Sequence, residues 1–170
     1  QALQEVSLAV DMALRAISID PTYTAPYLLI ADWFAKGDWY SRGTEDEKAI
    51  RFYIQYLSLE PEDIEAAVRL GQVLLRVEDY GNLERHVLPL LTSHPEAMDL
   101  LSIAAQWAYS LERYDASAGY WARYLDRVEM REKEAYIDLL PILTEAEGPA
   151  YRVLSAGERR AFEARLWNQR

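Results

Sequence analysis

The 170-residue sequence contains no cysteine, only two histidines, and no two glycines one residue apart. Without cysteine there is no disulfide, thiolate nucleophile or Cys-ligated zinc site. Without the Gly-x-Gly spacing there is neither a dinucleotide-binding fingerprint nor a glycine-rich phosphate loop. Neither histidine stands in a His-Glu-x-x-His pattern, and no serine lies in Gly-x-Ser-x-Gly. The sequence therefore predicts no catalytic residue, no metal site and no cofactor.

Positive charge is also scarce, because 18 Lys and Arg face 28 Asp and Glu, which gives a formal net charge of −10. Binding to a phosphate backbone depends on basic side chains that displace counterions, so this balance disfavours a nucleic-acid partner. Long hydrophobic runs are missing as well. The longest uncharged stretches, 100–111 and 21–31, are far shorter than the roughly 20 apolar residues of a membrane span, so no transmembrane segment is expected.

A 34-residue period runs through the chain, and a fixed period of this length is the signature of a repeat architecture. Four sets of residues follow it: Leu57, Leu91 and Leu125; Pro61 and Pro95; Tyr80 and Tyr114; Gly71 and Ala105. The preceding unit is longer, because Ala31 precedes Gly71 by 40 residues instead of 34. An inserted loop would account for the difference. We therefore predict an inserted loop at 40–46.

Each unit predicts two short helices, since its apolar residues recur at steps of three and four, and strand-like alternation is absent. Turn-forming residues at 78–82 separate the two helices of one unit, and Pro95 is expected to end the second. Two capping boxes, Thr44 with Glu47 and Ser155 with Glu158, predict further helix starts. The apolar stripes of this unit are Ile64, Ala67, Val68, Leu70, Gly71, Leu74 and Leu75, then Leu83, Val87, Leu88, Leu90 and Leu91.

Three successive units share a pattern of aromatic, small and turn residues followed by proline. The matching positions are Tyr27, Ile30, Ala31, Phe34, Gly37, Asp38, Trp39, Ala49, Tyr53 and Pro61; Leu70, Gly71, Asp79, Tyr80, Val87 and Pro95; Ala104, Ala105, Tyr114, Ser117 and Trp121. This pattern resembles the tetratricopeptide repeat family. Departures are Leu83 in place of the usual alanine, no proline at Glu129, and Leu139 where a small residue is expected.

The resemblance implies an all-α, right-handed α-solenoid of helix-turn-helix repeats with a C-terminal capping helix. We predict a repeat array over 1–131, made of a partial unit at 1–20 and units at about 24–61, 64–95 and 98–129, followed by a degenerate repeat and the capping helix over 132–170. Ala31, Gly71 and Ala105 are expected to let neighbouring helices approach closely. An unrelated helical bundle is the alternative.

The resemblance also implies a partner-binding groove lined by the first helix of each unit, which suits an extended or helical peptide. By the period, its predicted residues are Leu28, Asp32 and Lys36; Val68, Gln72 and Arg76; Ser102, Gln106 and Tyr109. The family's clamp for C-terminal carboxylates needs Lys and Asn where this chain has Leu28 and Asp32, Val68 and Gln72, and Ser102 and Gln106. Chaperone-tail binding of that type is therefore not expected.

The tail at 151–170 is basic and carries five Arg against two Glu. The simpler interpretation is a helix that shields the last repeat, with Leu154, Phe162, Leu166 and Trp167 on one face. The tail also resembles the opening of the GWxTD domain of exported bacterial proteins, although the motif that names this family is absent. That resemblance implies a bacterial cell-envelope protein, whereas the residues themselves do not reveal the compartment.

These features predict a noncatalytic scaffold that binds a protein partner within a larger assembly. Two alternatives remain open at this point. One is a helper or regulatory domain of a longer enzyme or GWxTD-type envelope protein, and the other is a small-molecule-binding bundle with a closed apolar cavity.

Overall fold

The structure is a computed structural model that describes residues 2–36, 42–128, 143–144 and 147–169. The chain divides into two compact units, 1–127 and 128–170. The described residues form helices and turns and contain no strand, so the predicted all-α class is confirmed. The predicted boundary between residues 131 and 132 lies outside the described residues.

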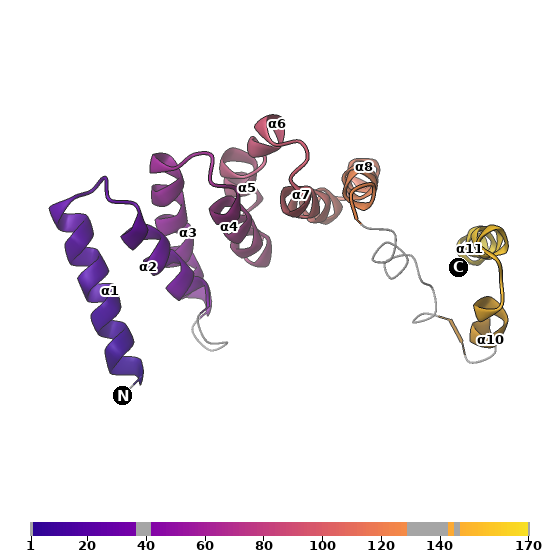
Figure 1. Cartoon of the computed structure of the whole chain (residues 1–170), viewed down its shortest axis with the longest axis horizontal. Helices are drawn as coiled ribbons and strands as arrows, with labels where there is room; N and C mark the ends of the chain where they lie inside the picture. Colours follow the sequence, from indigo (N-terminus) through magenta and orange to yellow (C-terminus); the bar gives the residue numbers. More distant parts are fainter. Residues whose placement is uncertain (1, 37–41, 129–142, 145–146, 170) are drawn as a thin grey trace. The chain divides into compact units, whose positions relative to one another are not determined.

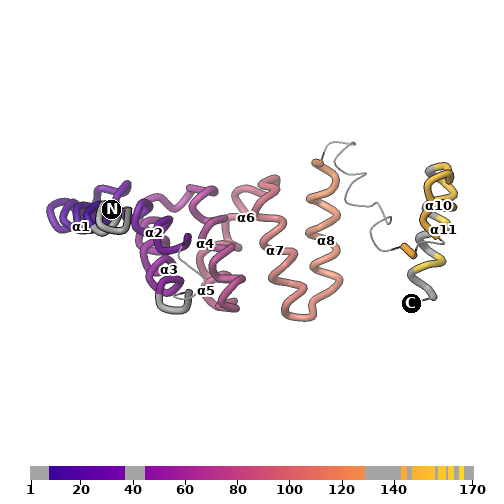
Figure 2. The backbone as a smooth tube through the Cα atoms, turned by 90° about the horizontal axis from the view of Figure 1, so that it is seen from below, coloured from indigo at the N-terminus to yellow at the C-terminus, as the bar shows by residue number. Residues whose placement is uncertain are grey.

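The first unit consists of helices that follow one another in chain order (Figures 1 and 2). α1 packs on α2, α2 on α3, α3 on α4, α4 on both α5 and α7, and α7 on α8. In the described parts of the chain, no helix is both long and apolar enough to cross a membrane. The bounds are α1 (Ala2–Ile19), α2 (Ala25–Ala35), α3 (Arg42–Leu59), α4 (Ile64–Arg76), α5 (Tyr80–His86), α6 (Leu90–Ser93), α7 (Met98–Ser110) and α8 (Tyr114–Leu125).

Two turns in this unit repeat each other one period apart, the first after α4 and the second after α7. Glu78 follows α4 with a φ of 59°, and Glu112 follows α7 with a φ of 58°. In both turns the residue after this glutamate donates its backbone N–H to the carbonyl oxygen five residues earlier in the chain. The bonds run from Asp79 to Leu74 O and from Arg113 to Ala108 O, each at 2.9 Å. A left-handed residue with this backward bond is the usual way to end one helix and start another. The corresponding turn of the preceding pair, 37–39, lies outside the described residues.

The small residues singled out from the period lie in the core of the first unit. Ala31 and Ala105 have no exposed surface, and Gly71 is buried. A Cβ on Gly71 would come within 3.0 Å of Ile103 Cγ2 in α7, so α4 and α7 approach closely at this residue. Ser117 of α8 is buried and donates its hydroxyl to Ala105 O at 2.8 Å, which satisfies its polar atom within the core.

Two predicted boundaries are wrong. α3 begins at Arg42, so 42–46 is helical rather than part of an inserted loop, and Thr44 does not start the helix. Glu45 supports the first turn near the positive end of the helix, and Asp46, the next residue, turns inward to an ion pair. The second helix of the next pair is broken into α5 and α6, because Pro89 has no N–H to donate and disfavours helical geometry before it.

The described residues of the second unit include the helices α10 (Glu147–Arg152) and α11 (Ala156–Gln169). The predicted helix start at Ser155 is confirmed, since Glu158 accepts from its backbone N–H at 2.8 Å and from its hydroxyl at 2.6 Å. A small cluster holds the helices together: Tyr151 and Leu166 are buried, and Leu143, Leu154 and Phe162 pack against them. The side chain of Trp167 lies outside the described residues.

Asp63 caps α4 and makes the first unit sensitive to acid. Burial opposes ionisation of this carboxylate, but hydrogen bonds from Tyr56 Oη at 2.6 Å and from the backbone N–H of Ala66 at 3.0 Å outweigh it and hold its pKa below the ordinary 3.8. The same contact and burial raise the pKa of Tyr56 to about 12. A carboxylate with a lowered pKa contributes stability that is complete above its unfolded pKa and is lost as the pH falls through its folded pKa.

We therefore expect Asp63→Ala to lower the free energy of unfolding by about 1 kcal/mol at pH 7 and by less at pH 3. Urea unfolding followed by circular dichroism at both pH values measures this difference. Asp63→Asn is the control, because asparagine caps a helix about as well as aspartate. An Asp63→Ala effect of equal size at both pH values would contradict the role of the charge.

Candidate functional site

The nine residues predicted to line a groove lie at or near the ends and exposed faces of three helices. α2 and its C-cap carry Leu28, Asp32 and Lys36, α4 carries Val68, Gln72 and Arg76, and α7 carries Ser102, Gln106 and Tyr109. Leu28 and Val68 are half-buried and pack against the core, so they contribute little to an open surface. The remaining residues are half-buried or exposed.

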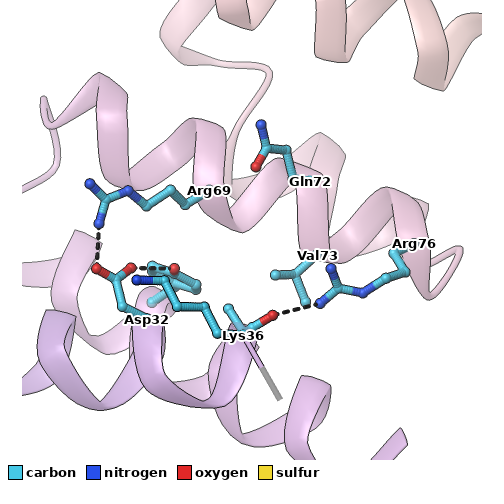
Figure 3. Close-up of a pocket in the computed structure, with 8 residues that line it drawn as sticks. Asp32, Lys36, Arg69, Gln72, Val73 and Arg76 are labelled. Atoms are coloured by element: carbon cyan, nitrogen blue, oxygen red, sulfur yellow. Dashed lines mark hydrogen bonds and ion pairs between the residues drawn. The ribbon is translucent and has the colours of Figure 1, made fainter. Parts of the chain in front are cut away.

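Four of these residues surround one hollow between α2, α3 and α4 (Figure 3). The hollow has a volume of about 440 Å³, within the range of ordinary ligand pockets. Its lining consists of the predicted Asp32, Lys36, Gln72 and Arg76, together with Ala35, Tyr53, Arg69 and Val73. The three residues predicted on α7 do not line it.

Asp32 is held at one side of the hollow by two partners from other helices. Tyr53 Oη donates to Asp32 Oδ1 at 2.6 Å, and Arg69 forms an ion pair with Asp32 Oδ2. Burial raises the pKa of Tyr53 above its ordinary value, and the hydrogen bond to the carboxylate raises it further. The pKa of Arg69 is raised by its hydrogen bonds to Asp32 and Glu65. Tyr53 therefore acts as a neutral donor and Arg69 as a fixed cation.

Arg76 is held at the other side of the hollow by a buried acid. Its guanidinium donates to Asp46 Oδ1 at 2.5 Å and to Asp46 Oδ2 at 3.3 Å, and it also reaches the carbonyl oxygen of Ala35 at 3.4 Å (Figure 3 shows this last contact). The Asp46 side chain is only 5% exposed, whereas that of Arg76 is 37% exposed. This bidentate pair ties α4 to the N-terminal part of α3.

Sequence reasoning missed Tyr53 and Arg69 as lining residues and Asp46 as an ion-pair partner. Only one of these contacts had a local signal, because Glu65 and Arg69 stand four residues apart on one helix and form an ion pair. The other contacts join residues 21, 30 and 37 positions apart, and no short-range pattern specifies them. Tyr53 is one of the aromatic positions of the repeat pattern, and it is buried.

The exposed face of α7 is polar and aromatic. Gln106 is exposed and donates to Ser102 O at 3.3 Å, and Ser102 in turn donates to Asp99 O. Tyr109 is 65% exposed, and its ring lies edge-to-face against that of Tyr114 of α8, with 5.6 Å between the ring centroids. These side chains leave a surface on which an extended chain could lie.

The histidines lie away from this hollow. His94 is the C-cap of α6, as expected for a residue beside Pro95, and its Nε2 lies 2.8 Å from Glu62. His86 is half-buried, and burial together with the charge of Arg85 lowers its pKa.

The hollow presents N–H donors and one carboxylate that two partners already occupy, so its chemistry suits the binding of a polar or anionic group. In the part of the chain that the structure describes, no three His, Asp or Glu side chains could hold a metal ion together. No protein-family model matches the sequence, and no curated protein matches it.

Proposed function

We propose that the chain is a noncatalytic, tetratricopeptide-like solenoid that binds a protein partner along the exposed faces of α2, α4 and α7. Support for the repeat comes from α4 and α7, which have 13 residues each and begin one period apart, at Ile64 and Met98. They end in turns with the same backbone conformation and hydrogen bonds. Equivalent helices then present equivalent faces, as stacked repeats do.

The observation that carries the docking proposal is the hollow beside Gln72. Repeat arrays bind partners on the surface that their repeated helices share, and here this surface combines a hollow with exposed polar and aromatic side chains. Ligand sites are concave and carry a few fixed polar groups, which is what Asp32, Arg69 and Arg76 provide.

Photo-crosslinking in the cells that make the protein tests this function. A photoreactive residue at Gln72 or at Gln106, both exposed, is expected to trap the same partner protein, because both positions face the proposed docking surface. The matched control is the same residue at exposed Glu84 of α5, which is expected not to trap it. Equal trapping from Glu84 would show that the partner does not bind specifically to the faces of α2, α4 and α7. No trapping from Gln72 and Gln106 would contradict the proposal.

A further inference from the structure

Large hydrophobic side chains are exposed in pairs on α1 and α2, which pack on each other (Figure 1). Leu8 and Met12 stand four residues apart on α1, and Leu29 and Trp33 stand four residues apart on α2, so each pair lies on one side of its helix. We call these four residues the end face. None of them lines the hollow. Single exposed apolar residues need no explanation, whereas a group of them marks a surface that binds another molecule.

On α1, the side that carries Met12 is open, whereas the equivalent side of α3 is covered. Met12 is 61% exposed, but Phe52, which stands 40 positions later in α3, is only 7% exposed. The ring centroid of Phe52 lies 6.5 Å from that of Tyr27 and 6.5 Å from that of Phe34, both in α2. On α3, α2 therefore occupies the position that is open on α1.

On α2, the exposed pair also has buried equivalents in a later helix. Trp33 is 42% exposed, but Trp107, its equivalent in α7, is 8% exposed. Ile103, the equivalent of Leu29, is buried and lies against Gly71 of α4. α4 packs both on α5, the second helix of its own pair, and on α7. A helix placed in the same way on α1 and α2 would cover all four residues of the end face.

A helix in this place must bring large side chains of its own. On α3, Tyr53 reaches α2, where its Oη donates to Asp32 Oδ1 at 2.6 Å, but the equivalent residue on α1 is the much shorter Ala13. Packed interfaces leave few empty volumes, so the occupant has to fill this space. We propose that the end face binds one amphipathic helix of another protein, with large apolar or aromatic side chains at steps of three and four. This surface is additional to the hollow, so the inference does not depend on the docking function proposed above.

A second copy of the chain is the less suitable occupant. Identical chains pair most often through the same surface on both, so a copy would present its own end face. The short Ala13 side chains of the two copies would then leave the space unfilled. A helix from another protein can supply the missing bulk, as Tyr27 and Phe34 of α2 do on α3.

A photoreactive residue in place of Met12 or Trp33, in the cells that make the protein, tests this inference. We expect both positions to trap the same segment of another protein. Mass spectrometry of the cross-linked fragment is expected to show large apolar residues at steps of three and four. Leu14 is the matched control position, because it is also exposed on α1 but lies about 200° around the helix from Met12, and it is expected not to trap that segment.

A substitution then assigns the trapping to the end face. Met12→Asp, combined with the photoreactive residue at Trp33, is expected to lower the trapped yield at least about tenfold, since the contact would bury a charge without a partner. Leu14→Asp is expected to leave the yield unchanged. Adducts with a second copy or within the same polypeptide, no adduct, or equal trapping from Leu14 would each overturn the inference. An unchanged yield with Met12→Asp would overturn it as well.

Discussion

Gly71→Leu is expected to lower the free energy of unfolding by about 3 kcal/mol, which is the upper range for overpacking a core. Gly71 is buried where α4 meets α7, and even a Cβ there would lie 3.0 Å from Ile103 Cγ2 and 3.4 Å from Val87 Cγ1. A leucine adds a branched side chain beyond that point, so the helices must separate. The midpoint of urea unfolding, followed by the helical circular dichroism signal, measures the loss.

Gly119→Ala is the matched control, because Gly119 lies within α8 and a Cβ there would meet nothing within 4 Å. The alanine is expected to raise the free energy of unfolding by about 0.5–1 kcal/mol, since glycine weakens a helix interior. If Gly71→Leu unfolded at the same urea concentration as the unchanged protein, the close approach of α4 and α7 would be refuted.

Arg76→Met is expected to lower the free energy of unfolding by about 2–3 kcal/mol, because it leaves the carboxylate of Asp46 buried without a partner. The figure is at the low end for a buried pair, since the Arg76 side chain is 37% exposed and water already screens part of the interaction. Methionine keeps much of the apolar stem, so the change measures the charge more than the packing. Urea unfolding at pH 7 gives the difference.

Removing the charge of Asp46 instead of that of Arg76 is expected to lower the free energy of unfolding by less. Asp46→Asn leaves a guanidinium that can turn to water, so we expect about 1 kcal/mol, and adding it to Arg76→Met should recover part of that variant's loss. If the two losses simply added in the double variant, the ion pair would not couple α3 to α4. For the same reason Arg76 is a poor position at which to test partner binding, and Lys36 and Gln72 are better ones.

Much of the helical layout could be predicted from the sequence, because it depends on local spacing. The turns after α4 and α7 lie where Asp79–Tyr80 and Arg113–Tyr114 interrupt the apolar stripes, and Ser155 starts α11 through a bond to Glu158, three residues away. The errors arose where another effect was stronger. Pro89 divides into two helices an apolar stripe from which the sequence predicts one helix. Asp46 pairs with Arg76, 30 residues away, and this pair favours a helical conformation where the sequence predicts a loop.

The candidate site could be predicted only by position. The period places Asp32, Lys36, Gln72 and Arg76 on equivalent helix faces, and the structure brings these four to one hollow. The 34-residue period could not predict that Tyr53 and Arg69 meet at Asp32, since that contact depends on how three helices pack. Nor could it reveal that Leu28 and Val68 turn partly into the core, because an apolar residue at the edge of a helix face fits either surface.

The central claim is that helix pairs one period apart pack side by side through small residues, and the nuclear Overhauser effect between Gly71 Hα and the methyl groups of Ile103 tests it most directly. The claim predicts a strong cross-peak, because the Gly71 backbone lies against Ile103 in the packed unit. A protein that is folded and helical but shows no cross-peak between these two residues would contradict the packing of α4 on α7, and with it the repeat and the docking face built on it.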